Sequence, residues 1–176
     1  MNRSQSFAIW ITGLPASGKS TIVRALKPQL EATGLTVEVL ESDEVRRVLT
    51  PEATYSQAER DLFYRALALM GAKLVAQGVT VLFDATATRR EYRDFARSLI
   101  PRFIEVAVVC PLETCMQRDY KGTYQRGLRG ETSTVPGLQE PYEVPLHPDL
   151  TIDTTYVPAN EAAENVFVLV KERFLQ

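Results

Sequence analysis

The fold is decided by residues 11–21, which read ITGLPASGKST. Residues 13–20 match the G-x-x-x-x-G-K-[ST] pattern of a phosphate-binding loop (P-loop), between an apolar run and a helical pattern that begins at Lys19. Glycines let successive backbone N–H groups converge on a phosphate at a helix N-terminus, where the helix dipole favours an anion. The stretch therefore predicts a nucleoside triphosphate site at the end of a strand.

The motif predicts a role for each of its residues. Lys19 would reach the β and γ phosphates, and the Ser20 hydroxyl would ligate Mg²⁺. The residues expected to bind ATP here are Gly13, Ala16, Ser17, Gly18, Lys19, Ser20 and Thr21. A Gly-Lys turn without function is the alternative, but the full motif in a strand-to-helix context favours the nucleotide site.

Apolar runs of period two alternate with helical patterns along the chain. Strands are expected at 8–12, 36–40, 79–84, 104–110 and 150–153, and helices at 19–33, 56–77, 89–100, 112–119 and 160–174. This alternation predicts an α/β protein of the P-loop NTPase fold, a five-stranded parallel sheet with helices on both faces. A single domain over residues 1–176 is expected. Residues 120–148 are rich in Gly and Pro and lack periodicity, which predicts a mobile lid.

Composition narrows the setting. The net charge of −2 provides no global attraction to nucleic acid. No apolar run approaches the ~20 residues of a membrane span, and the polar first residues do not form a secretion signal. We therefore expect a cytoplasmic protein with neither a nucleic-acid nor a membrane partner. Cys110, Cys115 and the distant His147 predict reduced thiols, not a disulfide framework or a zinc site.

Two acidic residues follow predicted strands close to the P-loop. Asp43 follows the second strand, where its carboxylate could accept the proton of an attacking hydroxyl while Arg46, one turn on, pairs an acceptor anion. Asp84 ends the third strand and is placed like a magnesium-assisting acid. The alternatives are an acidic first helical turn for Asp43 and a helix or turn cap for Asp84.

A P-loop alone does not distinguish a kinase from a GTPase or a motor. The chain contains no N-K-x-D segment for guanine recognition and is too short for most motors. A lid, together with polar residues after the second and third strands, favours a small kinase that binds a second substrate there.

From Ile9 to Thr154 the sequence resembles adenylylsulfate kinase, a family that passes the ATP γ-phosphate to the ribose 3′-hydroxyl of adenosine 5′-phosphosulfate (APS). The most specific similarity is RDYKGTY at 118–124 and PYEVP at 141–145, which resemble the family's R-D-x-K-G-L-Y and P-Y-E-x-P. The resemblance implies that Arg118 packs on the ATP adenine. It also implies that Lys121 reaches the phosphates as the lid closes, so that the expected catalytic residues are Lys19, Asp43 and Lys121.

The resemblance and the arginine pattern together predict an acceptor site for a small anion, APS in the first instance. The residues expected there are Asp43, Arg46, Tyr55, Arg60, Arg90, Lys121 and Val135. Guanidinium groups suit phosphate and sulfate oxygens. Three other arginines are expected on solvated helix faces: Arg65, Arg93 and Arg97. A core-facing stripe is expected at Leu62, Phe63, Leu67, Met70, Leu74 and Val75.

Several positions depart from the family pattern. Ala87 replaces a serine that is sometimes assigned a phosphorylated intermediate, which excludes covalent transfer there. Phe63 replaces an asparagine, and Val135 replaces one of two phenylalanines that stack on the APS adenine. A lost stacking face is worth on the order of 1–3 kcal/mol per base, which is enough to change substrate preference.

Two other functions therefore stay open beside an APS kinase. One is a kinase for another nucleotide-like or small alcohol acceptor, and the other is a non-catalytic nucleotide-binding module. Intact Lys19, Ser20, Asp43 and Lys121 argue against the non-catalytic module. Mg²⁺, held by Ser20 and Asp84, is the expected cofactor. A homodimer is left as an option.

Overall fold

The computed structural model describes residues 6–175, which form a five-stranded parallel sheet. The strands are β1 (Ala8–Thr12), β2 (Val37–Glu41), β3 (Thr80–Asp84), β4 (Phe103–Val109) and β5 (Leu150–Asp153). Their order in the sheet is β2-β3-β1-β4-β5. The predicted fold is confirmed, and the strand bounds differ from the predicted ones by a single residue where they differ at all.

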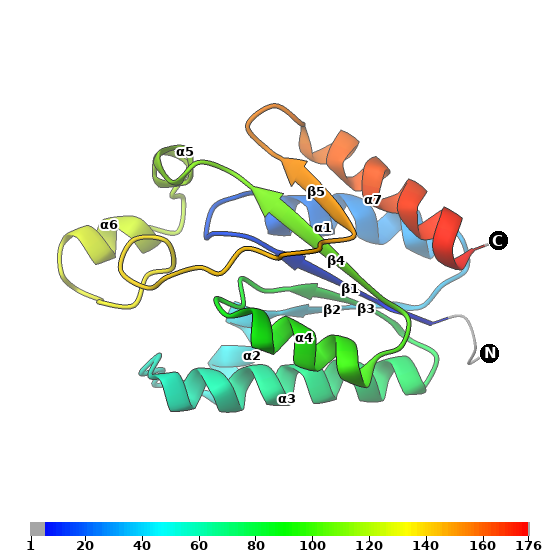
Figure 1. Cartoon of the computed structure of the whole chain (residues 1–176), viewed down its shortest axis with the longest axis horizontal. Helices are drawn as coiled ribbons and strands as arrows, with labels where there is room; N and C mark the ends of the chain where they lie inside the picture. The colour runs from blue at the N-terminus through cyan, green and yellow to red at the C-terminus, as the bar shows by residue number, and fades with distance from the viewer. Residues whose placement is uncertain (1–5, 176) are drawn as a thin grey trace.

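Helices cover both faces of the sheet. They are α1 (Lys19–Glu31), α2 (Ser42–Leu49), α3 (Gln57–Ala76), α4 (Arg90–Leu99), α5 (Leu112–Gln117), α6 (Thr123–Leu128) and α7 (Ala159–Phe174). In Figure 1, α1 and α7 lie on one face and α2, α3 and α4 on the other, while α5 and α6 lie beyond the carboxyl ends of the strands. None of the described helices is long and apolar enough to cross a membrane.

The central strand β1 is buried on both faces, because its alternate side chains enter two different cores. Ile9 and Ile11 pack in a cluster with α1 and α7, whereas Ala8 and Trp10 pack in a second cluster with α3 and α4. The Trp10 ring stacks on Phe83 with centroids 4.5 Å apart. A continuous apolar strand with neighbours on both sides is typical of a buried parallel sheet.

Strand register brings the functional segments to one edge. In the parallel pairing, Asp84 lies opposite Ile11 of β1 and opposite Glu41 of β2. The P-loop, the start of α2 and the end of β3 therefore meet where these three strands end. This is the crevice in which open α/β sheets bind ligands.

Two helices and two side chains differ from the predictions. The short helices α2 and α6 were not predicted, and α6 lies inside the segment expected to be an irregular lid. Leu62 and Met70, which were expected in the core, are 71% and 38% exposed. Only one face of α3 packs on the sheet and α4, and these two side chains lie on the opposite face.

Gly71 of α3 allows this helix to pack closely on β3. A Cβ at Gly71 would lie 2.1 Å from the Phe83 Cζ. We predict that Gly71→Ala lowers the free energy of unfolding by about 1–3 kcal/mol, because it displaces Phe83 from a packed core. Thermal unfolding should show a lower melting temperature, by about 2–4 °C for each kcal/mol.

The control is Leu69→Ala on the exposed face of the same helix, where we expect a change within about 0.5 kcal/mol. An unchanged melting temperature for Gly71→Ala would show that Phe83 can move without cost.

Candidate active site

The P-loop joins β1 to α1, and its glycines leave room that a side chain would fill. A Cβ at Gly13 would lie 2.5 Å from the Val108 carbonyl oxygen and 2.8 Å from the Ser17 Oγ. Gly18 is the N-cap of α1 with a φ of 101°, a conformation that favours glycine. The loop therefore places backbone N–H groups around the N-terminus of α1, as an anion site requires.

Lys19 is a buried cation at the centre of this site. Its Nζ donates hydrogen bonds to the carbonyl oxygens of Gly13 (3.1 Å) and Leu14 (2.8 Å), and the residue is 8% exposed. Burial lowers the pKa of Lys19, while the Asp84 and Asp43 carboxylates act in the opposite direction. A bound anion would offset the cost of this burial.

Asp84 and Ser20 provide oxygen donors next to Lys19. Asp84 is 5% exposed; burial raises the pKa of its carboxyl, and the Lys19 charge and a hydrogen bond from Ser20 oppose that rise. These are the hard oxygen ligands that Mg²⁺ prefers. Among residues 6–175 there is no group of three or more His, Cys, Asp or Glu side chains that could hold a metal. Mg²⁺ bound here would therefore take its remaining ligands from phosphates and water.

A cavity of about 940 Å³ opens over these groups. It brings together most of the predicted site residues: Ala16, Gly18, Lys19, Ser20, Thr21, Asp43, Arg46, Tyr55, Arg60, Asp84, Arg118, Lys121 and Val135. Three predicted residues do not line it: Gly13, Ser17 and Arg90. Gly13 and Ser17 belong to the P-loop backbone beneath the cavity, whereas Arg90 lies elsewhere.

Arg46, which lines the cavity, is held by aromatic rings. Its guanidinium carbon lies 3.8 Å from the Phe63 ring centroid and 4.9 Å from that of Tyr55, and its Nη1 donates to Glu59 Oε1 at 3.0 Å. Phe63, expected in the core-facing stripe of α3, is buried and also stacks on an arginine. A guanidinium fixed in this way is oriented before an anion arrives.

Glu59 was missed by the sequence analysis, although the S-x-x-E pattern at 56–59 is typical of a helix N-terminus. Its carboxylate accepts bonds from the Thr54 N–H (2.6 Å) and the Tyr55 N–H (3.3 Å), as well as from Arg46. Burial raises the pKa of Glu59, but these bonds outweigh it and hold the pKa below its usual range. The bonds order Tyr55, whose φ of 53° is uncommon for a residue with a side chain.

Arg60 and Arg118 connect the body of the protein to the lid and to β5. Arg60, 4% exposed, donates to the Tyr55 carbonyl (3.0 Å) and across to the Thr134 carbonyl of the lid (2.9 Å). Arg118 donates to the Thr154 carbonyl (3.1 Å), and the Thr154 hydroxyl donates to the Ser17 carbonyl of the P-loop (2.7 Å). Thr154 therefore fixes Arg118 beside the nucleotide loop.

Lys121 of the lid pairs with the acidic residues after β2. Its Nζ lies 2.8 Å from Asp43 Oδ2 and 3.4 Å from Glu41 Oε1. Partial burial lowers the pKa of Lys121, but the bond to Asp43 and the two carboxylate charges outweigh it and raise that pKa. Asp43 is in the first turn of α2, as the alternative interpretation had it, and it also lines the cavity.

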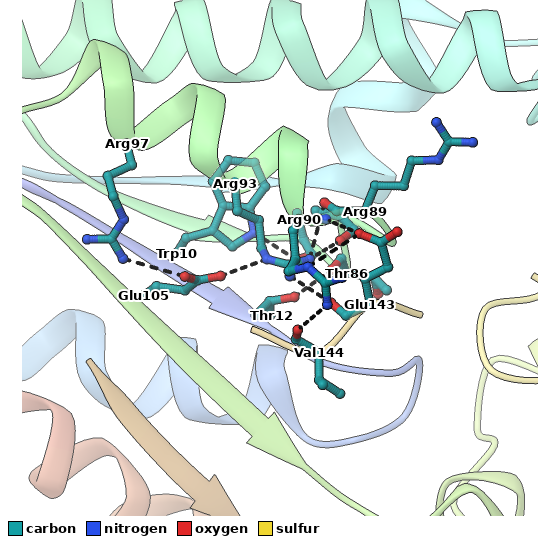
Figure 2. A network of polar contacts seen from close by, with 12 residues as sticks. Trp10, Thr12, Thr86, Arg89, Arg90, Arg93, Arg97, Glu105, Glu143 and Val144 are labelled. Atoms are coloured by element: carbon teal, nitrogen blue, oxygen red, sulfur yellow. Dashed lines mark hydrogen bonds and ion pairs between the residues drawn. The ribbon is translucent and has the colours of Figure 1, made fainter. Parts of the chain in front are cut away.

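Arg90 and Arg93 differ from their expected positions, whereas Val135 lines the cavity as expected but with little exposed surface. Arg90 donates through Nη1 to the Val144 carbonyl (3.1 Å) instead of facing the cavity. Arg93, predicted on a solvated face, is 1% exposed and pairs with Glu105, as Figure 2 shows. Val135 is 3% exposed, because it packs with Tyr124 in an apolar cluster beneath the lid.

We predict that the Lys121–Asp43 ion pair holds the lid over the cavity when no ligand is bound. Lys121→Gln should make residues 120–138 more susceptible to limited proteolysis, and added salt should have a similar effect on the wild type because the pair is partly exposed.

Arg129→Gln is the matched control, since Arg129 pairs within the lid with Glu131 and not with the body. Equal proteolysis rates in Lys121→Gln and wild type would show that other contacts close the lid.

The chain is similar in sequence to known proteins. The family model described as adenylylsulphate kinase matches residues 5–153. A probable adenylyl-sulfate kinase of Archaeoglobus fulgidus is 41% identical over 149 residues, which cover 85% of this chain and 96% of that protein. The adenylyl-sulfate kinase of Rippkaea orientalis is 36% identical over 97% of this chain and 94% of its own.

Solved structures agree with the sequence comparison. The APS kinase of Mycobacterium tuberculosis in complex with AMPPNP and APS superposes with a TM-score of 0.89 at 31% identity, covering 95% of this chain and 98% of its own. A gluconokinase of Sinorhizobium meliloti, 18% identical with a TM-score of 0.62, shares the fold. With the P-loop, the cavity and a family model that spans most of its length, this chain belongs to the adenylylsulphate kinase family.

Proposed function

We propose that this kinase transfers the γ-phosphoryl group of MgATP directly to the 3′-hydroxyl of APS. The observation that carries the proposal is that one cavity holds a buried, anion-seeking Lys19 and, on the other side, the Asp43 carboxylate with two oriented arginines. Donor and acceptor groups thus face the same space. The relatives named as adenylyl-sulfate kinases and the complex with AMPPNP and APS support this choice of acceptor.

On the donor side, the chain binds and orients the triphosphate. The P-loop N–H groups and Lys19 would neutralise charge that develops at the β–γ bridge. Mg²⁺, when bound through Ser20 and with Asp84 nearby, supplies further charge neutralisation at the phosphate oxygens. Arg118, which donates to the Thr154 carbonyl, would pack on the adenine.

On the acceptor side, Asp43 would orient the attacking hydroxyl or accept its proton. Lys121 is paired with Asp43 in the present arrangement. Substrate binding would break this ion pair, so that Lys121 contacts the phosphates and Asp43 contacts the hydroxyl. Arg46 and Arg60 would pair the phosphosulfate anion, and the Tyr55 ring would stack on the acceptor base. The lid excludes water that could otherwise accept the phosphoryl group.

We propose smaller roles in acceptor binding for Val135 and Arg90 than the sequence suggested. Val135 borders the cavity with little exposed surface, so we assign it a supporting role in the wall and no stacking role. Arg90 would act at most through the chain segment it binds.

We also retain the remaining expectations as part of the proposal. They are one kinase domain over residues 1–176, a lid at about 120–148 that moves, Mg²⁺ as the cofactor, a cytoplasmic location and the option of a homodimer. The roles proposed above do not depend on these expectations, except that the roles of Ser20 and Asp84 require Mg²⁺.

The assay that tests the acceptor measures ADP release with ATP and Mg²⁺, with and without APS. We expect ADP release that depends on APS and yields the 3′-phosphorylated product. APS-independent turnover, or turnover only with other alcohols in a panel of nucleotide-like and small acceptors, would assign a different acceptor to the same scaffold. Absence of turnover with every acceptor would support a non-catalytic module.

We predict that Asp43→Asn lowers kcat by about 10²–10⁴, because the amide cannot accept the proton of the hydroxyl. Lys19→Ala should lower kcat by at least about 10²–10³ through lost charge stabilisation. Circular dichroism should show both variants folded.

Glu44→Gln is the matched control, since Glu44 lies in the same turn of α2 as Asp43 but is exposed and does not line the cavity. A near-normal rate for purified Asp43→Asn would remove Asp43 from the proton-transfer role.

A further inference from the structure

Arg93 is a buried charge in a place where the proposed reaction does not require one. It lies on α4, is 1% exposed and pairs through Nε with Glu105 of β4 at 2.7 Å. Burying an ion pair stabilises a fold little compared with apolar packing, because both ions lose their hydration. The other contacts of the Arg93 guanidinium must therefore explain why this charge is buried.

The rest of the guanidinium binds main-chain oxygens from two distant segments. Nη1 donates to the carbonyl oxygens of Ala87 and, at 3.3 Å, of Arg89, while Nη2 donates to the Glu143 carbonyl at 2.7 Å. Ala87 and Arg89 belong to the β3–α4 loop (residues 85–89). Glu143 belongs to residues 140–144 near the C-terminal end of the lid, which we call the strap. Figure 2 shows Arg93 between Glu105 and Glu143.

The strap has further attachments to the same loop. The Glu143 N–H donates to the Thr88 carbonyl at 2.8 Å, and the Glu143 carboxylate accepts from the Arg90 N–H at 2.9 Å. The Arg90 side chain reaches the Val144 carbonyl, which accounts for its absence from the cavity. The lid is thus fastened at its C-terminal end to the chain that follows Asp84.

A second connection runs through the residue that precedes the P-loop. The Thr12 hydroxyl donates its one proton to the Thr86 carbonyl at 2.6 Å, so the Tyr142 hydroxyl must donate to Thr12 Oγ1 at 3.0 Å. Thr86 lines the cavity. Strap, β3–α4 loop and β1 are therefore joined at one point beside the cavity. Ala87 of this loop binds the hydroxyl of Tyr64, whose ring centroid lies 5.8 Å from the Arg46 guanidinium carbon on the proposed acceptor side.

The loop conformation depends on these bonds. Ala87 has a φ of 46°, in the left-handed region that a residue with a Cβ rarely adopts. Its N–H donates to the Tyr64 hydroxyl at 3.2 Å and its carbonyl accepts from Arg93. A strained residue of this kind persists only where its surroundings impose the conformation.

We propose that Arg93 is a positioning residue that fixes the strap as the stationary hinge of the lid and sets it against the acceptor wall of the cavity. The inference rests on the proposed function, because it concerns the acceptor of that reaction. Arg93 itself is buried behind the loop and acts through Thr86, Ala87 and the strap. Lid movement is then confined to the part of the chain before the strap, which carries Lys121 and Thr134.

The test compares Arg93→Lys with Arg97→Lys. Lysine keeps the charge beside Glu105 but lacks the planar fork that joins two main-chain segments. Arg97 lies one turn further on α4 and also contacts Glu105, but its other ion pair is with Asp149, away from the strap. Arg97→Lys therefore controls for the effect of replacing an arginine that pairs with Glu105 on the same helix.

Two readouts distinguish positioning from a general structural role. In Arg93→Lys we expect faster amide hydrogen exchange in a peptide covering 140–144, where Glu143 N–H is bonded to Thr88. We also expect the specificity constant for the acceptor to fall by about tenfold or more, while the Kd of a nonhydrolysable ATP analogue changes less than about twofold. Arg97→Lys should leave both readouts at wild-type values.

Tyr142→Phe provides a second, milder variant if Arg93→Lys does not fold. It removes only the hydroxyl that binds Thr12, and we expect the same split between acceptor and nucleotide with a smaller change. Unchanged strap exchange, or nucleotide and acceptor affinities that fall together, would overturn the inference. The exchange readout requires no acceptor, so it decides the inference even if the wild type fails to phosphorylate APS and the proposed function is lost.

Discussion

The arrangement of the site depends on the buried ammonium group of Lys19 and on the groups that surround it. A cation taken out of water is costly, and here the hydrogen-bond partners described for Nζ are two carbonyls of its own loop. Burial lowers its pKa, whereas the neighbouring Asp84 and Asp43 carboxylates favour the charged form. A phosphate anion would complete this set of charges. The P-loop backbone, the end of β3 and the start of α2 are arranged around that one group.

Three of the contacts that hold the lid to this centre differ in their chemistry. Lys121 forms a partly exposed ion pair with Asp43, which solvent and ligands can compete for. Arg60 reaches the Thr134 carbonyl from a buried position. The strap is bound by main-chain bonds and by the buried Arg93. On the hinge that we propose above, this gradient from exposed to buried contacts would give the lid one end that opens and one that stays in place.

The sequence predicted what local patterns encode. The strand-loop-helix pattern around Gly13 to Lys19 predicted the P-loop and the edge of the sheet at which it lies. The positions of Asp43 and Asp84 after predicted strands indicated that both lie beside this loop. The sequence did not predict Arg93, because a charged residue on an amphipathic helix usually faces solvent and its partners, Glu105 and Glu143, are distant in sequence. Leu62 was misplaced for a related reason: helical spacing identifies a stripe, but which stripe is buried depends on how α3 packs. The short helix α6 was not predicted, because the glycines in and around it are typical of loops.

The most direct test of the central claim is a crystal structure with Mg²⁺, a nonhydrolysable ATP analogue and APS bound together. We predict the γ-phosphate beside Lys19 Nζ and the 3′-hydroxyl within about 2.6–3.2 Å of an Asp43 oxygen, with Lys121 moved from Asp43 to the phosphates. A triphosphate bound away from the P-loop, or an Asp43 still paired with Lys121 and out of reach of the hydroxyl, would contradict it.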